Sequence, residues 1–380
     1  MAAGSLRLVC APDKFRDSLT AAQVAAAMAA GGRAAGWTCV EHPIADGGEG
    51  TIDVLLTARP GELVEVAGVD ALAREHASRY AILADGTAVI VAADSIGLAL
   101  LDPAERDPLK ASSAGLAYPL LDALERGATR VVVCVGGTAT MDGGLGFLAG
   151  LGVTMRGLPE AGPVTGASVG AVLGLDLTRV LDRLRGKELI VASDVAAVLA
   201  GPQGAARTYA PQKGADEATV AFLDEGLARL ADVYGPLAWQ PGAGAAGGLG
   251  VALMALGAHR ISGADFVLDA TGFVDVLEGA DLCLTGEGRI DQTSGDGKAV
   301  SAVLRACERA GVPCVLLGGA VAESGEELYG SGAGGLFAVG RQPQPLLDAL
   351  ASTGSDVRAT ARAVCELAAS MRRRGTAPTP

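Results

Sequence analysis

The chain has 380 residues, of which half are hydrophobic and only 3% aromatic, and its formal net charge is −13. This length can bury a large core and favours two domains over one. The acidic balance argues against a nucleic-acid-binding protein, since such proteins present a basic face.

The sequence also bears on the location of the protein and the state of its cysteines. No apolar run has the length of a membrane span, and the first residues, MAAGSLRLVCAPDKF, show no signal peptide. The seven cysteines form no C-x-x-C pair, and most lie inside apolar runs, so we expect buried thiols in a reducing cytoplasm. Three scattered histidines do not predict a zinc site.

The N-terminal sixty residues alternate strand, polar loop and helix, which is typical of a parallel sheet. Thr20 and Gln23 form a capping box at the start of an Ala-rich helix. The predicted elements are strands Leu6–Cys10 and Trp37–Glu41, a helix from Thr20 to about Ala30, and a helix over Ile52–Thr57.

The middle of the chain has a different pattern, which begins with consecutive strands. Asp85-Gly86 is a strong hairpin signal between two of them. The predicted strands are Glu62–Ala67, Ser78–Leu83, Thr87–Ala92, Arg130–Val135 and Glu188–Ser193, with helices over Ser112–Arg126 and Asp216–Val233.

The strand–helix alternation returns after a glycine-rich stretch, TGEGRIDQTSGDGK at 285–298. We predict strands at Asp281–Leu284, Val312–Leu317 and Gly335–Val339, a helix from Lys298, and two helices near Gln344–Ala351 and Asp356–Met371. The fold class is therefore α/β with two domains. A Rossmann-like or flavodoxin-like parallel-sheet domain is made from both chain ends (1–60 plus 290–380), and a mixed α/β domain (61–289) is inserted.

Five polar loops follow predicted strands, where α/β proteins place ligands. Arg16, in the first loop, could hold a carboxylate in bidentate fashion. The glycines and hydroxyls of the third loop suit phosphate oxygens, and Asp142 could reach a metal. Each loop could instead be a solvated turn or a helix cap. The loops are Asp13–Ser18, Asp46–Thr51, Gly136–Gly144, Ser193-Asp194 with Gln212–Gly214, and Thr285–Lys298.

A dinucleotide-binding reading is weak. Gly242, Gly244 and Gly247 fit G-x-G-x-x-G, but no convincing strand precedes them, and Gly330, Gly332 and Gly335 fit it equally well. The Walker A pattern fails around Gly297-Lys298. An NAD-dependent oxidoreductase is kept as an alternative.

Several blocks together resemble the type I glycerate kinase family, in the same order and with similar spacing. They are APDKFRDSLTA at 11–21, PIADGGEGT at 43–51, GGTATMDGGLG at 136–146, PQKGA at 211–215, PGAGAAGGLG at 241–250 and TGEGRIDQTSGDGK at 285–298. The chain departs from the family pattern at Arg16-Asp17, usually Lys-Gly, at Met141, usually Asn, and after Asp194, where Asn-Pro-Leu is missing.

The resemblance implies phosphorylation of D-glycerate by ATP with Mg²⁺, most often at the 2-hydroxyl, in a cleft between two α/β domains. Phosphorylation at the 3-hydroxyl, a related hydroxy acid, or a non-catalytic anion-binding relative are alternatives. Expected partners are glycerate and ATP, without nucleic acid or membrane, and the chain is expected to be a monomer or homodimer.

Phosphoryl transfer needs positioning, Mg²⁺ and cations rather than a covalent nucleophile, which gives each loop a hypothetical role. The predicted catalytic residues are Asp46 or Asp194 as base, Asp291 and Lys298. The predicted metal ligands are Glu287, Asp291 and Asp142. The predicted phosphate-binding residues are Gly136, Gly137, Thr138, Thr140, Lys213 and Lys298, and the predicted substrate-binding residues are Lys14, Arg16 and Arg289.

Overall fold

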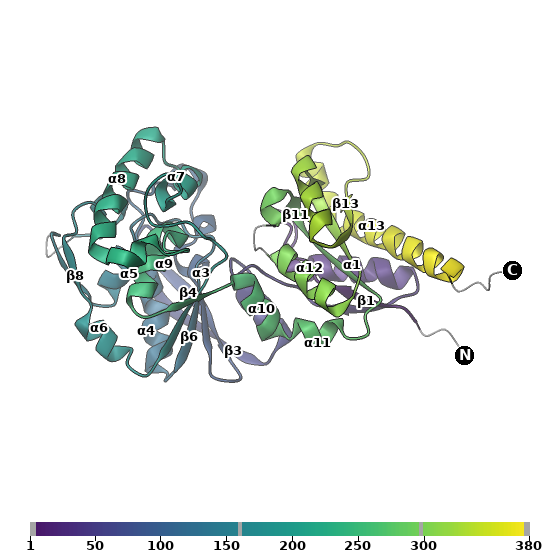
Figure 1. Ribbon diagram of the computed structural model, residues 1–380, viewed down its shortest axis with the longest axis horizontal. Coiled ribbons are helices and arrows are strands. Elements are labelled where there is room, and N and C mark those ends of the chain that lie inside the picture. The colour runs from purple at the N-terminus through teal and green to yellow at the C-terminus, as the bar shows by residue number, and fades with distance from the viewer. Residues whose placement is uncertain (1–4, 159–161, 296–298, 376–380) are drawn as a thin grey trace. The chain divides into compact units, whose positions relative to one another are not determined.

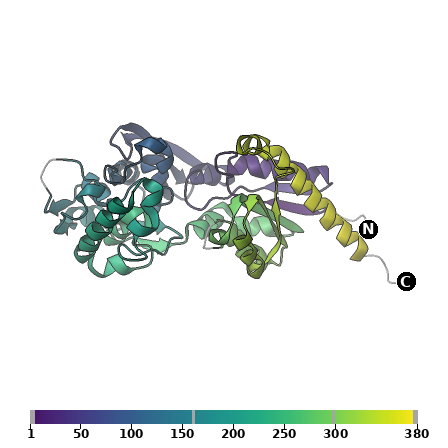
Figure 2. The same cartoon turned by 90° about the horizontal axis from the view of Figure 1, so that it is seen from above.

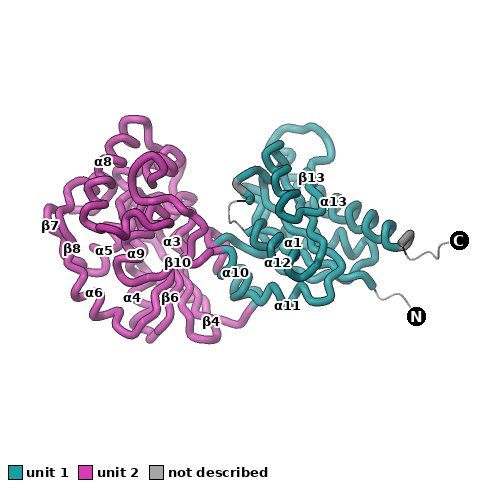
Figure 3. The backbone as a smooth tube through the Cα atoms, in the orientation of Figure 1, with its two compact units in different colours: residues 1–46, 53–58, 264–380 teal, residues 47–52, 59–263 magenta. Residues whose placement is uncertain are grey.

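The computed structural model describes residues 5–158, 162–295 and 299–375, and these divide into two compact units (Figure 3). Unit 1 contains the chain up to Asp46, Asp53–Ala58, and the chain from Ala264 onward. Unit 2 contains Gly47–Ile52 and Arg59–Gly263. Residues 264–289, which the sequence analysis assigned to the inserted domain, therefore lie in unit 1.

Unit 1 is built on a five-stranded parallel sheet with the order β13-β12-β11-β1-β2 (Figure 1). Numbered within this unit alone, the strand order is 2-1-3-4-5, the flavodoxin-like arrangement. The strands are β1 (Arg7–Cys10), β2 (Thr38–Glu41), β11 (Leu282–Ile290), β12 (Cys314–Val321) and β13 (Ala333–Ala338).

Helices cover both faces of this sheet. Helices α1 and α13 lie side by side on one face (Figures 1 and 2), where Met28 and Val357 belong to one buried cluster with Leu8 of β1. Helices α10, α11 and α12 pack on the other face with Cys283 and Leu316. The helices of unit 1 are α1 (Ala21–Ala34), α10 (Gly263–Thr271), α11 (Phe273–Leu277), α12 (Ala299–Ala310) and α13 (Leu346–Gly375), and α2 (Thr51–Ala58) lies mostly in it.

The local rules explain most of these elements. The capping box at Thr20 and Gln23 is present at the start of α1. Helix α12 has an apolar face, and its residues Val300, Val303, Leu304 and Cys307 are all buried.

Two predictions for unit 1 were wrong. Gly286–Ile290, expected as loop, continues β11 because the backbone pairs with β12, with Glu287 opposite Gly318 and Arg289 opposite Ala320. The two predicted C-terminal helices are a single helix, α13. The Thr353 hydroxyl donates to the carbonyl oxygen of Ala349, four residues earlier, so it is accommodated within the helix.

Unit 2 is built on a mixed six-stranded sheet with the order β10-β9-β6-β5-β4-β3. The β3–β4 and β4–β5 pairs are antiparallel and the remaining pairs are parallel, and the hairpin predicted at Asp85-Gly86 joins β4 to β5. The strands are β3 (Gly61–Val69), β4 (Glu75–Leu83), β5 (Ala88–Val91), β6 (Arg130–Cys134), β9 (Glu188–Ala192) and β10 (His259–Ile261), with a separate β7 (Thr154–Arg156) and β8 (Gly174–Asp176) pair.

Apolar helix faces and one face of this sheet form the largest buried cluster, which includes Val131 and Val133 of β6 and Leu227 of α8. The predicted helix over Ser112–Arg126 begins as a 3-10 turn, Ser113–Leu116, before α4. The helices are α3 (Ala92–Ile96), α4 (Ala117–Glu125), α5 (Leu145–Gly150), α6 (Thr178–Arg183), α7 (Ala205–Tyr209), α8 (Glu217–Tyr234) and α9 (Ala245–Ala255). No helix in the described parts of the chain is both long and apolar enough to cross a membrane.

Candidate active site

The first candidate site lies in unit 1, where the strand order reverses between β1 and β11. Ligands of open parallel sheets bind outside the carboxyl ends of the strands at such a switch point. The chain leaving β1 stays bonded to β11, because Ala11 N donates to Leu284 O at 2.7 Å and Asp13 N donates to Gly286 O at 2.9 Å. These bonds fix Asp13 at the switch point.

Asp13 is buried there among like charges. Burial, together with the charges of the neighbouring Asp46 and Glu287, raises the pKa of its carboxyl from 3.8 to about 7, while Lys14 opposes the shift. The Lys14 backbone N–H donates to Asp13 Oδ1 at 2.6 Å. Asp46 and Glu287 are half-buried, so three carboxyl groups lie close enough to interact at one place. Asp13, which received no role from the sequence, is the most buried of them.

This cluster passes the chemical test for Mg²⁺. Carboxylate oxygens are the hard ligands that this ion prefers, and a cation relieves the repulsion that raises the pKa of Asp13. The predicted ligand Glu287 belongs to the cluster. Asp291 lies further along, after β11, and Ser294 Oγ accepts a hydrogen bond from its backbone N–H at 3.1 Å.

The predicted carboxylate-binding cations lie on the same loops. The loop carrying Lys14 and Arg16 passes over β11 at Gly288, where a Cβ atom would stand 3.2 Å from Arg16 N. A side chain at Gly288 would therefore displace this loop. Lys14 is half-buried and Arg16 is exposed. Arg289 Nε lies 3.3 Å from Asp291 Oδ2 in a surface ion pair. Lys298 lies outside the described residues.

The second candidate site is the loop that follows β6 in unit 2. Lys213 is buried against it, and its Nζ donates to the carbonyl oxygen of Thr140 at 2.7 Å and to Thr138 Oγ1 at 3.4 Å. Burial lowers the pKa of Lys213 from 10.5 to about 7, although Asp142 opposes the shift. Within the described residues the hydroxyl of Thr140 is buried and has no hydrogen-bond partner.

The predicted phosphate-binding residues of unit 2 are therefore brought together. Gly136 packs closely on Gly48, and the Gly137 carbonyl accepts a hydrogen bond from Leu98 N at 2.8 Å. The loop thus combines a buried amine with a hydroxyl that lacks a partner. Both groups could bind the oxygens of an anion.

Asp142 is better suited to hold this loop than to bind a metal. It is fully buried, and its carboxylate accepts hydrogen bonds from Ser113 N and Oγ, both at 2.7 Å, and from Gly144 N and Gly146 N, both at 3.1 Å. Because these donors contact both oxygens, Asp142 is suited to fix the loop's shape, and its metal-ligand role stays a prediction.

The second glycine-rich segment, 241–248, supports the first. Gly143 N donates to Gly247 O at 2.9 Å, and a Cβ at Gly247 would stand 2.1 Å from Thr140 O. A 3-10 turn, Gly235–Trp239, precedes this segment instead of a strand. The dinucleotide-binding pattern at Gly242 therefore lacks its required strand, and its glycines serve close backbone packing.

Asp194 follows β9, the neighbour of β6. It is half-buried, and its Oδ1 accepts a hydrogen bond from Gly263 N at 3.0 Å. The chain after it lacks the usual Asn-Pro-Leu but is still fixed, since Gly244 N donates to Ala197 O at 2.9 Å.

Arg106 is a candidate that the sequence analysis missed. Its carbonyl lies against Gly214, next to Lys213, and its Nε is buried without a hydrogen-bond partner among the described residues. Its acidic neighbours are paired elsewhere, Glu105 with Arg74 at 2.9 Å and Asp107 with Lys110 at 2.9 Å. Because a buried polar nitrogen without a partner is costly, Arg106 is a second cation suited to a phosphate near Lys213.

The chain is similar to known proteins over most of its length. The model of the "Glycerate kinase family" matches residues 8–369. A glycerate kinase from Halalkalibacterium halodurans is 38% identical over 87% of this chain and 90% of its own length. The Bacillus subtilis glycerate kinase is 34% identical over 97% and 98%, and the Escherichia coli glycerate 2-kinase is 35% identical over 88% and 90%.

A solved structure gives the same result for the fold. The crystal structure of a Salmonella typhimurium LT2 protein, provisionally assigned as glycerate kinase 2, superimposes with a TM-score of 0.79. It is 32% identical and covers 98% of this chain and 100% of its own.

Proposed function

We propose that this protein transfers the γ-phosphoryl group of ATP to D-glycerate and yields 2-phosphoglycerate. The chain belongs to the glycerate kinase family. It is therefore a phosphotransferase that acts on an alcohol group. The relative named glycerate 2-kinase supports the choice of the 2-hydroxyl. The observation that carries the proposal is the buried Lys213, whose Nζ contacts the 136–140 loop. A lysine without a carboxylate ion pair in the described residues is suited to an anion from outside the protein.

We assign the nucleotide phosphates to unit 2. Lys213, Arg106 and the Thr140 hydroxyl would bind phosphate oxygens, and the Gly136-Gly137 backbone leaves room for a close approach. Such contacts stabilise charge that moves between oxygens during transfer. Asp142 keeps the loop in this shape through its four hydrogen bonds.

We assign the acceptor hydroxyl and Mg²⁺ to unit 1. Asp46 is more exposed than Asp13 and shares its charge cluster, so Asp46 is suited to accept the hydroxyl proton. Glu287 and Asp291 would hold Mg²⁺, which when bound neutralises phosphate charge. Lys14 and Arg16 would bind the glycerate carboxylate, with Arg289 orienting Asp291.

Asp194 stays an alternative base and Lys298 an alternative phosphate ligand. We also propose that the reaction takes place in a cleft between the two domains and that the protein is cytoplasmic. The domain limits predicted from the sequence stay a prediction.

One assay tests the proposal. Purified protein is given ATP and D-glycerate with and without Mg²⁺, ADP release is coupled to a reporter, and the product is identified by NMR. We expect turnover only with both substrates and Mg²⁺, and a phosphate on the 2-hydroxyl. A 3-phosphate would correct the regiochemistry alone, whereas no ADP release with glycerate would overturn the proposal.

A further inference from the structure

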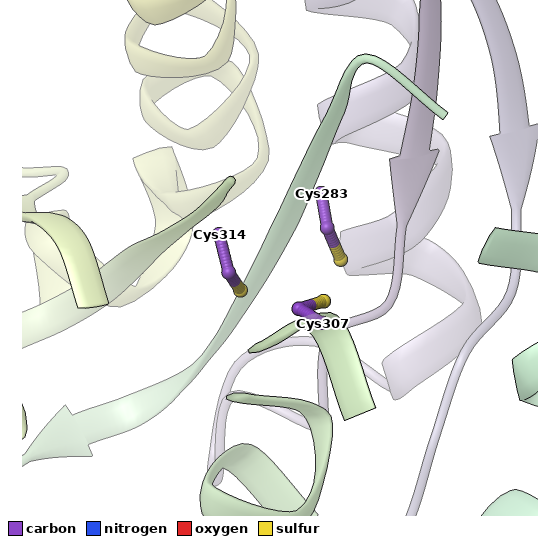
Figure 4. A group of neighbouring side chains, drawn as sticks. All are labelled: Cys283, Cys307 and Cys314. Atoms are coloured by element: carbon purple, nitrogen blue, oxygen red, sulfur yellow. The ribbon is translucent and has the colours of Figure 1, made fainter. Parts of the chain in front are cut away.

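Three cysteines of unit 1 meet in a buried, apolar part of its core. Cys283 on β11 stands directly opposite Cys314 on β12 in the parallel register, so both side chains point to the same face of the sheet. Helix α12 covers this face and brings Cys307 to them. Figure 4 shows the three thiols directed toward one another from three separate elements.

The spacing of the three sulfurs fits a single metal ion. All three Sγ atoms lie within 4.8 Å of one another. Three sulfurs each about 2.3 Å from one ion in a trigonal arrangement stand roughly 4.0 Å apart. Small side-chain rotations would therefore close the site.

The surroundings determine which ion is suitable. The cluster is buried among apolar side chains such as Phe273, Val303 and Leu304. Uncompensated charge is costly in such a core. Three thiolates with a divalent ion leave one negative charge, whereas three thiolates with a monovalent ion leave two.

Thiolates are soft ligands that select thiophilic ions over Mg²⁺ or Ca²⁺. No fourth His, Cys, Asp or Glu joins the group in the described ranges, and zinc usually requires one.

We propose that Cys283, Cys307 and Cys314 bind one soft divalent d¹⁰ cation through three sulfurs, as a structural site that ties α12 to β11 and β12. On binding, each thiol loses its proton to solvent, three metal–sulfur bonds form, and no oxidation occurs. This site is independent of phosphoryl transfer. A bound ion should also resist separation of α12 from the sheet.

The experiment uses Cd²⁺ as the test ion and Zn²⁺ as the comparison. Each ion is added to the folded reduced protein and, separately, supplied during expression, because the buried cysteines could be reached more easily before folding ends. We expect one Cd²⁺ per chain by elemental analysis, a thiolate-to-cadmium charge-transfer band in the ultraviolet, and a higher melting temperature. Because zinc lacks its fourth ligand, we expect weaker retention of Zn²⁺.

Variants separate this cluster from the other thiols. Cys307→Ser should abolish the band and the melting shift, while Cys365→Ser, a buried cysteine of unit 1 in the cluster on the opposite face of the sheet, should keep both. If Cys307→Ser does not fold, Cys314→Ser replaces it. Absence of the band from the wild type in both loading arms, or its persistence in the Cys307 or Cys314 variant, would overturn the proposal.

Discussion

The two units concentrate charges of opposite sign in buried surroundings, and each does so at a cost. In unit 1, burial and neighbouring like charges raise the pKa of Asp13 to about 7. In unit 2, burial lowers the pKa of Lys213 to about 7. Each arrangement is relieved by a ligand of the other sign, a cation in unit 1 and an anion in unit 2. The comparison indicates that both sites are arranged for ligands and that neither favours its ligand-free state.

The variant Lys213→Met tests the proposed anion site of unit 2 and should have the largest effect. Loss of the cation should lower kcat/KM by about 10²–10³ through lost phosphate contacts. The folded protein should be no less stable, because the charged lysine is the disfavoured form in this site. Steady-state kinetics and thermal unfolding measure both. Lys110→Met, at an exposed lysine of the same unit, is the control, and near-normal turnover of Lys213→Met would contradict the assignment.

Arg106→Gln sharpens the description of unit 2. A charged hydrogen bond is worth roughly 1.5–3 kcal/mol, which corresponds to about 10–100-fold in the KM for ATP. We expect that increase without a loss of melting temperature, because Arg106 forms no ion pair with another described residue. Arg179→Gln, at an exposed arginine of unit 2, is the comparison. A loss of stability with unchanged KM would instead show a structural role.

The titration of Lys213 predicts a pH dependence for nucleotide binding. Above about pH 7 the ligand-free lysine loses its proton, so binding an anion must restore it. The Kd for ATP should therefore rise with pH above 7, by at most about tenfold per unit. Lys213→Arg stays charged and should flatten this rise. Calorimetric titrations of both proteins between pH 6 and 9 measure it, and parallel profiles would refute the prediction.

Asp13→Asn tests unit 1 through stability. The folded pKa of Asp13 is about 7 against 3.8 for the ordinary carboxyl, so the folded state holds the extra proton between these values. Stability from this group is then lost as pH rises from about 3.8 to 7. The variant should gain stability relative to the wild type at pH 8 but not at pH 4, as followed by urea unfolding.

The effect of Mg²⁺ on stability is an independent test of the carboxylate cluster around Asp13. Mg²⁺ should raise the melting temperature of the wild type more at pH 8 than at pH 4, since protons compete for the carboxylates. The effect should shrink in Asp13→Asn and persist in Asp348→Asn, at an exposed position on α13. Equal responses in all three proteins would place the ion elsewhere.

Asp17→Gly has the smallest expected effect. Asp17 has a φ of 63°, a left-handed conformation that glycine adopts without strain, and it stands where the family pattern usually has glycine. We expect the variant to be more stable by no more than about 1 kcal/mol, measured by chemical unfolding. Asp17→Val, which is β-branched, should be destabilised, and the reverse order would contradict the backbone argument.

Sequence patterns predicted most of the framework because they act locally. The capping box at Thr20 and the Asp85-Gly86 turn each specify structure within a few residues. The continuation of β11 through Gly286–Ile290 was not predictable in this way, since its glycines and charges look like a loop and only pairing with β12 keeps them extended.

The site was predictable in composition more than in roles. Loops after β1, β6 and β9 carry the expected residues because strand ends expose them. Burial, however, is a property of the whole fold, so the altered pKa of Asp13 and the saturated carboxylate of Asp142 could not be deduced from their neighbours in sequence. Arg106 could not be singled out from the sequence, because it lies between two acidic residues, Glu105 and Asp107, and only the fold shows that both pair elsewhere.

The arrangement of unit 1 has a consequence for synthesis on the ribosome. Strand β1 is made first, yet its partner β11 begins only at Leu282. At about 5–20 residues per second, the first strand waits on the order of tens of seconds for its neighbour. Arg59–Gly263 is continuous and emerges in the interval. We therefore expect the early strands to need protection from misassociation until the last third of the chain arrives.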